Sequence, residues 1–229
     1  MHNKGCIICG KDLEYYDMNI ELNCNVCAKK FNSNVKCIDG HFICDNCHRS
    51  DALEYIENYC MNSLEADPAK IAVEIMKNPK IKMHGPEHHF LVPAVLLSAY
   101  YNTQEKHETI MEKLIIAKER SLNILGGFCG FYGNCGAGVG TGIFMSIINN
   151  TTPLSKYEWK LCNLMTAKSL ENIGNCEGPR CCKRDTFIAI ETTIDFLEKY
   201  SKVVLKKSII KCIFHGMNNE CKKNDCRYY

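Results

Sequence analysis

The sequence predicts a mostly α fold, in which a helical bundle body over residues 51–229 follows a small zinc-stabilised, β-rich module over residues 1–50. Two observations support this prediction. Cysteines and one histidine arrive in close pairs along the first fifty residues, which is typical of modules folded around zinc. Beyond them, apolar residues recur at the three- and four-residue spacing of helices that bury one face.

The composition excludes several classes of protein. A net charge of +2 and 24% charged residues give no overall attraction to nucleic acid or to a membrane surface. The first residues lack the apolar core of a secretory signal, and the longest nearly apolar run, residues 90–101, is too short to span a bilayer. Seventeen cysteines are unusual, and in a reducing cytoplasm they are expected to bind metals or to carry redox chemistry. We therefore expect a cytoplasmic, cysteine-rich, metal-binding protein.

The N-terminal module contains eight residues of the types that bind zinc. They come in four pairs: Cys6/Cys9, Cys24/Cys27, Cys37/His41 and Cys44/Cys47. Because a structural zinc site takes four ligands, two pairs complete one site and the eight residues make two. Neighbouring pairs could share an ion, as in zinc ribbons, or alternate pairs could do so, as in the cross-braced sites of RING-like modules. The spacing of the last four ligands favours the cross-brace.

The helices of the body are marked by capping residues and prolines. Asp67 and Pro68 have the residue types of an N-cap and a first helical position. Ser155 and Glu158 form the pattern of a capping box at the start of a later helix. Further helices are expected in the apolar periodic segments 52–60, 90–97, 103–125 and 187–197.

A histidine-rich motif stands at the entrance of the 90–97 helix. It contains His84, Glu87, His88 and His89, and it leads directly into apolar residues that a core would bury. Imidazoles and a carboxylate anchored in this way can ligate a metal, shuttle protons or bind an anion. We expect these four residues to be catalytic; the alternative is that His84 and Glu87 cap the helix.

Residues 126–142 hold eight of the fifteen glycines, together with Cys129 and Cys135. Glycine lets the backbone adopt left-handed conformations and approach a bound group closely. Glycines four residues apart in the second half could instead form a helix face that packs tightly on a neighbour. The dinucleotide and phosphate-loop signatures do not fit. The segment therefore suggests cluster or redox chemistry, tight packing, or both.

Two further groups of cysteines follow. Cys181 and Cys182 open the 187–197 helix beside basic residues, so the helix dipole and the charges are expected to favour their thiolates. We expect them to meet Cys129 and Cys135 at one site, where thiolates can hold an iron–sulfur cluster. The basic tail adds three thiols, which either bind a second cluster with one open position or protect the first: Cys212, Cys221 and Cys226.

Four features of the body occur together: His84-Gly-Pro-Glu-His-His-Phe, Gly127-Phe-Cys-Gly-Phe-Tyr-Gly-Asn-Cys-Gly-Ala, Gly178-Pro-Arg-Cys-Cys-Lys-Arg and the three tail cysteines. In combination they resemble an uncharacterised cysteine-rich family of anaerobic archaea and bacteria, the domain of unknown function 5714, over roughly residues 50–229. The resemblance implies no activity, but such domains are sometimes joined to methyltransferase or radical-chemistry domains. The Cys-Gly-Ala turn at Cys135 is also similar to that of small redox proteins with a C-GCAxxG-C-C motif, which implies cluster or disulfide chemistry.

Two functions fit these expectations. The first is a protein with two zinc ions and an iron–sulfur cluster, for example of the 4Fe-4S type, with a redox, sulfur-transfer or methyl-transfer role in an anaerobe. The second is a non-catalytic zinc adaptor that docks a methyltransferase, a radical enzyme or a cluster-assembly partner. Acidic and basic side chains balance over residues 1–50, so nucleic acid is not an expected partner of the module. The basic tail leaves RNA binding as a weaker third option.

Overall fold

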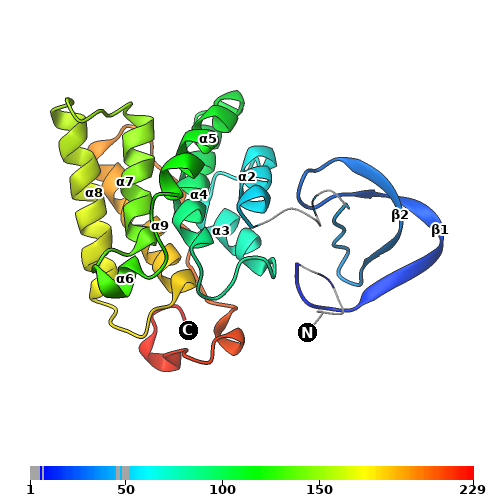
Figure 1. The fold of residues 1–229 in the computed structure, drawn as a ribbon. Helices are drawn as coiled ribbons and strands as arrows, with labels where there is room; N and C mark the ends of the chain where they lie inside the picture. Colours follow the sequence, from blue (N-terminus) through cyan, green and yellow to red (C-terminus); the bar gives the residue numbers. More distant parts are fainter. Residues whose placement is uncertain (1–5, 7, 45–46, 48–51) are drawn as a thin grey trace.

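The protein consists of a small hairpin module and a larger helical body, as a computed structural model of the chain shows (Figure 1). The structure describes residues 6, 8–44, 47 and 52–229. The predicted boundary between residues 50 and 51 lies outside the described residues. A mostly helical body that follows a two-stranded sheet confirms the predicted fold class.

The module is built on an antiparallel hairpin of β1 (Leu13–Asn23) and β2 (Lys30–Cys37). Most side chains of β1 are exposed, and β2 fully buries only Cys37, so the hairpin has almost no apolar core of its own. A lone two-stranded hairpin is marginally stable in water at best. The buried residues of the module are mainly its cysteines, so its stability has to come from what the cysteines bind.

The body is a bundle around α4 (Glu87–Thr103), which is apolar on all sides and almost completely buried. α8 (Tyr157–Gly174) packs on the outside, against α7 and α9. The helices that contact α4 directly are α2 (Ala52–Asn62), α3 (Pro68–Lys77), α5 (Ile110–Ser121), α7 (Gly136–Ile148) and α9 (Cys182–Tyr200).

Helix boundaries agree with the prediction where a side chain caps the first turn. The Asp67 carboxylate accepts hydrogen bonds from two backbone N–H groups at the start of α3, as expected. The predicted 103–125 helix is shorter in the structure: α4 ends at Thr103, the 3-10 turn η1 (His107–Thr109) follows, and α5 spans Ile110–Ser121. The Ser155 hydroxyl accepts a hydrogen bond from the N–H of Thr152 instead of capping α8, so the predicted capping box is wrong.

The glycines of α7 let this helix pack closely on both of its neighbours. A Cβ atom on Gly136 would lie 2.1 Å from the ring of His89, and one on Gly140 would lie 2.9 Å from Cδ of Pro93, both in α4. The alternate glycines of α7 approach α8 in the same way. The small-residue packing face considered for this segment is therefore confirmed.

One end of the bundle, at the bottom of Figure 1, carries the residues expected to be functional. α4, α7 and α9 begin there, and the C-terminal tail crosses it. The short α6 (Phe128–Phe131) lies between Gly127 and Gly133, whose φ angles of 84° and 62° require glycine's freedom. The tail contains the 3-10 turns η2 (His215–Met217) and η3 (Lys223–Asp225).

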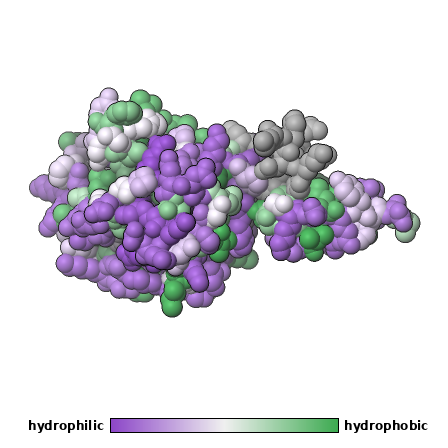
Figure 2. Space-filling model, turned by 90° about the horizontal axis from the view of Figure 1, so that it is seen from below, coloured by the Kyte–Doolittle hydropathy of each residue, from purple (hydrophilic) through white to green (hydrophobic). Residues whose placement is uncertain are grey.

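The surface is largely polar. Figure 2 shows one face of the molecule, on which hydrophilic side chains predominate and apolar side chains occur in small groups. Among the described residues, no helix combines the length and the apolar character that crossing a bilayer requires.

Candidate metal centres and a thiol-lined cavity

The module brings its eight predicted ligands together in two groups. Within each group the ligand atoms lie within 4.8 Å of one another. The pairs alternate along the chain, which confirms the cross-braced arrangement and excludes the adjacent pairing. The groups are Cys6, Cys9, Cys37 with His41, and Cys24, Cys27, Cys44 with Cys47.

The spacing within the first group suits one tetrahedral ion. Cys9 Sγ lies 3.4 Å from Cys37 Sγ, and Cys6 Sγ lies 3.8 Å from His41 Nδ1. Zinc–sulfur bonds of about 2.3 Å at tetrahedral angles place two ligands about 3.8 Å apart. The backbone N–H of Asp39 donates to Cys37 Sγ over 3.4 Å, and such a bond stabilises a metal-bound thiolate. The two groups are therefore suited to metal ions such as zinc.

The two groups differ in their surroundings. Cys24, Cys44 and Cys47 belong to the same buried cluster as the core of the helical body. Cys6 and Cys37 belong to a separate, smaller cluster within the module. An ion in the second group would therefore tie the module to the body, whereas an ion in the first group would shape the module alone.

The body divides the cysteines that were expected to share one cluster. Cys129, Cys135 and Cys182 line a cavity of about 250 Å³ where α4, α7 and α9 begin, called here the helix-start cavity. The adjacent Cys181, an extended residue just before the helix, lines a different space. This second space, called here the tail pocket, is lined by four cysteines: Cys181, Cys212, Cys221 and Cys226.

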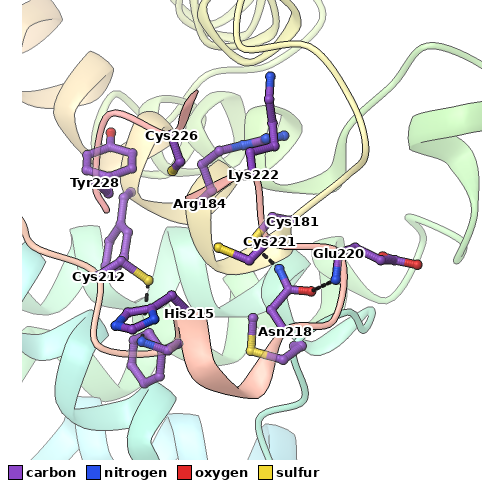
Figure 3. Close-up of a pocket in the computed structure, with 13 residues that line it drawn as sticks. Cys181, Arg184, Cys212, His215, Asn218, Glu220, Cys221, Lys222, Cys226 and Tyr228 are labelled. Carbon is purple, nitrogen blue, oxygen red and sulfur yellow. Dashed lines mark hydrogen bonds between the residues drawn. The ribbon is translucent and has the colours of Figure 1, made fainter. Parts of the chain in front are cut away.

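The tail pocket collects thiols from the start of α9 and from the C-terminal tail (Figure 3). At Cys212 and at Cys221, the backbone N–H two residues later donates to the sulfur over 3.4 Å. The amide nitrogen of Asn218 approaches Cys181 Sγ at 3.7 Å. The same donation from two residues later occurs at Cys37 of the module. The tail thiols thus have the hydrogen bonds that metal-bound thiolates receive.

The tail pocket lacks the close ligand spacing of the two module groups. In the described part of the chain, only the two module groups bring three or more metal-binding atoms within 4.8 Å of one another. An iron–sulfur cluster holds its thiolates farther apart, because several iron and sulfide ions lie between them. The free space is about 20 Å³. This space is far smaller than a cluster with its bridging sulfide ions, so a cluster there would have to push the tail outward.

Burial dominates the acidity of the thiols at the start of α9. It raises the pKa of Cys182 to about 12, and it raises the pKa of Cys181 as well. Arg184 lowers the pKa of Cys181 and Arg180 lowers that of Cys182, in the predicted direction, but burial outweighs both. Two of the basic residues beside the cysteine pair are engaged elsewhere: Lys183 Nζ donates to two backbone carbonyls, and Arg184 pairs with Asp185 at 3.1 Å.

Two histidines that line the helix-start cavity each keep one ring nitrogen without a hydrogen-bond partner among the described residues. His89 Nδ1 lies 3.0 Å from the carbonyl oxygen of Ile124, which can only accept, so the proton is on Nδ1 and Nε2 has a free lone pair. Burial lowers the pKa of His89, so this ring is neutral at pH 7. His84 Nε2 lies 3.3 Å from Glu220, and His84 Nδ1 is buried without a hydrogen-bond partner.

The other two residues of the motif make structural contacts. His88 is 1% exposed, with Nε2 3.0 Å from the carbonyl oxygen of Lys82 and Nδ1 3.0 Å from the Thr186 hydroxyl of α9. Burial lowers its pKa to about 3. The Glu87 carboxylate accepts the N–H of Lys82 over 2.8 Å and does not line the helix-start cavity. An edge of His88 lines the cavity, but both its nitrogens are engaged, so His88 and Glu87 fix the loop before α4.

Sequence reasoning left two polar residues of the helix-start cavity out of the predicted site. A hydrogen bond to the thiol of Cys129 raises the pKa of Arg180, which places this guanidinium beside a cavity cysteine. Asp185 lies in the first turn of α9, where an acidic side chain stabilises a helix start. The signal for both was their position, within a few residues of the cysteine pair that opens α9.

Comparison with known proteins gives a family without a known activity. A family model described as a family of unknown function (DUF5714) matches residues 56–229. No curated protein and no solved structure matches the chain. The matched region contains the helix-start cavity and the tail pocket, and both groups of module ligands lie outside it.

Proposed function

We propose that this chain, which belongs to the family of unknown function DUF5714, is a metal-binding redox protein with two zinc ions in its module and an iron–sulfur cluster in its tail pocket. One observation carries the proposal: four thiols reach the tail pocket from two segments that are distant in the sequence. When bound, such a cluster supplies single electrons. Its ligands would be Cys181, Cys212, Cys221 and Cys226.

Aromatic side chains that shield the tail pocket support this proposal. The rings of Phe187 and Tyr228 meet edge to face with centroids 5.4 Å apart, and Phe214 lies under Lys183 Nζ at 4.2 Å. Exclusion of water and hydrogen bonds to sulfur are two factors that set the potential of a cluster. The residues around the pocket supply both.

The tail pocket and the helix-start cavity are linked by two adjacent residues. A cluster ligated by Cys181 lies one peptide unit from Cys182, whose thiol lines the cavity. The arrangement supports redox, sulfur-transfer or methyl-transfer chemistry on a molecule in the cavity. The reacting thiols would be Cys129, Cys135 and Cys182.

A groove of about 440 Å³ on the body favours a second candidate, a zinc adaptor that docks a protein partner such as a methyltransferase or a radical enzyme. Its wall includes Leu53, Phe90, Leu122 and Leu125, and the last two are each 60% exposed. Exposed apolar side chains along one groove are typical of protein interaction sites. An adaptor of this kind would bind zinc and no iron.

Metal analysis of protein purified without oxygen tests the first candidate against the second. We expect iron and broad visible absorption in addition to zinc at both module groups. Cys212→Ser and Cys221→Ser should each remove the iron and leave the zinc content unchanged, because neither residue belongs to a module group. Cys129→Ser should keep the iron, which separates a cluster in the tail pocket from one in the cavity.

Cys162→Ser is the matched control, because Cys162 is a half-buried thiol of α8 that lines neither space. Its iron content should equal that of the wild type. A colourless protein containing only zinc would refute the cluster and favour the adaptor. Full iron content in the Cys212 and Cys221 variants would remove these residues from the site.

A further inference from the structure

Three helices begin at the wall of the helix-start cavity, which is lined by residues at the starts of α4, α7 and α9: Pro86, Cys135, Gly136 and Cys182. At none of these three starts does the N-cap side chain make the hydrogen bond that Asp67 makes in α3, although in α4 the N–H groups of His88 and His89 donate to the carbonyls of Gly85 and Pro86. At α7, the amides of Ala137 and Gly138 lie near the Cys135 sulfur and lower its pKa, although burial outweighs them. First-turn N–H groups carry partial positive charge and favour anions.

The side chains of the cavity add to this positive character. Arg180 lines the cavity with its guanidinium beside the Cys129 thiol, and Glu220 is the carboxylate that acts on it electrostatically. His84, also in the lining, has a buried Nδ1 without a hydrogen-bond partner among the described residues, and its Nε2 lies 3.3 Å from Glu220. The acidic residue of the lining, Asp185, is paired with Arg184, so its charge is compensated.

The size of the cavity indicates a small molecule. Its volume of about 250 Å³ far exceeds that of one ion. Its thiols and imidazoles do not bring three metal-binding atoms within 4.8 Å of one another in the described part of the chain. The charged and polar residues at its wall do not suit an apolar ligand.

We propose that the helix-start cavity binds a small molecule with an oxyanion group, such as a carboxylate or a phosphate, held between Arg180 and the starts of the three helices. The rest of the ligand then lies beside the thiols of Cys135 and Cys182, with the free Nε2 of His89 available to accept a proton. The inference deepens the proposed function because it names a substrate class for the thiol chemistry. Binding of the anion does not itself require the cluster.

Two alkylating reagents that differ in charge test this proposal on the full chain. Iodoacetate and iodoacetamide modify thiols by the same displacement of iodide, but only iodoacetate carries a carboxylate. For each cysteine, mass spectrometry gives the rate of alkylation by iodoacetate divided by the rate of alkylation by iodoacetamide. Most of the effect of exposure and thiol acidity cancels in this ratio. We expect this ratio at one or more of Cys129, Cys135 and Cys182 to exceed that at Cys162 by about tenfold or more, as hydrogen bonds to a charged group would produce.

Arg180→Gln should lower the ratio toward the value at Cys162. Arg227→Gln is the matched control, because Arg227 is an exposed arginine that pairs with Glu191 and does not line the cavity. Equal ratios at the cavity thiols and at Cys162, or a preference that Arg180→Gln leaves intact, would overturn the proposal.

If the cavity thiols react with neither reagent, calorimetric titration with inorganic phosphate decides the question. Binding that Arg180→Gln abolishes supports the anion site, and no binding at millimolar phosphate refutes it. Neither readout depends on iron. A colourless protein that shows the charge preference would therefore refute the cluster and support the anion site. An iron-containing protein without the preference would support the cluster and refute the anion site.

Discussion

The module and the body arrange cysteines in different ways. In the module, Cys9 and Cys37 sulfurs lie 3.4 Å apart and those of Cys27 and Cys44 lie 3.9 Å apart, close to the edge of a tetrahedron around one ion. The body gathers its thiols around two spaces. Among its described residues, no three metal-binding atoms lie within 4.8 Å of one another. The module therefore has the ligand spacing of single ions, whereas the body spreads its thiols over the walls of two separate spaces.

The two parts also differ in what stabilises them. The strands of the module expose most of their side chains, so little apolar area is removed from water when the hairpin forms. The body buries nearly all of α4 and closes its glycine contacts without gaps. Bound metal should therefore do for the module what apolar burial does for the body.

Removal of zinc should give the largest difference in stability between the module and the body. A chelator should unfold the hairpin, because binding of structural zinc contributes on the order of 10 kcal/mol to the folding of small zinc modules. The helical circular dichroism of the body should persist. Limited proteolysis should then cut within β1 and β2 before it cuts within α4.

An unchanged protection of the hairpin in the chelated protein would contradict a metal-dependent module. Loss of the helical signal together with the hairpin would show that the body depends on metal as well. That second outcome would point to Cys24, Cys44 and Cys47, which share a buried cluster with the body.

The sequence predicts those features that local spacing determines. The four ligand pairs follow from short spacings such as that of Cys37 and His41, whereas the structure shows which pairs share a group. The start of α3 follows from Asp67, whose carboxylate reaches amides two and three residues later. Both depend on interactions over a few residues and need no knowledge of the rest of the chain.

Features that depend on distant segments could not be predicted in the same way. The separation of Cys181 from Cys182 depends on the path of the tail over α9, where the N–H of Cys212 donates to the carbonyl of Tyr228. The structural contacts of His88 depend on a hydroxyl in α9, far along the sequence. A local motif gives the residue types at such a site but not the neighbours that decide their roles.

A single methyl group in the body tests whether packing stabilises it. In Gly140→Ala, the new Cβ would meet Cδ of Pro93 at 2.9 Å and the backbone oxygen of His89 at 3.2 Å, so α4 and α7 would have to separate. We expect the free energy of unfolding to fall by about 1–3 kcal/mol, as overpacked cores do. Urea denaturation followed by the helical signal measures it.

Gly174→Ala is the matched control, because a Cβ there has no neighbour within 4 Å. Its free energy of unfolding should stay close to that of the wild type. The zinc content of both variants should be unchanged, since α7 and α8 supply no module ligand. Equal stability of the two variants would mean that the contact between α4 and α7 relaxes without cost.

The pH dependence of stability is expected to give the smallest effect, and it distinguishes a buried neutral group of the body from acid release of metal in the module. Burial lowers the pKa of His88 from 6.5 to about 3. Between these two pH values the unfolded chain binds a proton at His88 and the folded chain does not. The contribution of His88 is therefore complete above pH 6.5 and is lost as the pH falls toward 3, by up to about 1.4 kcal/mol per pH unit.

In His88→Gln, the amide can keep the hydrogen bond to the Lys82 carbonyl without titrating, so the free energy of unfolding of the body between pH 7.5 and pH 5.5 should fall less steeply. Zinc release occurs in both proteins and cancels in the comparison, and His107→Gln controls for the loss of an imidazole as such. Identical slopes in wild type and His88→Gln would show that His88 is not held neutral in the fold.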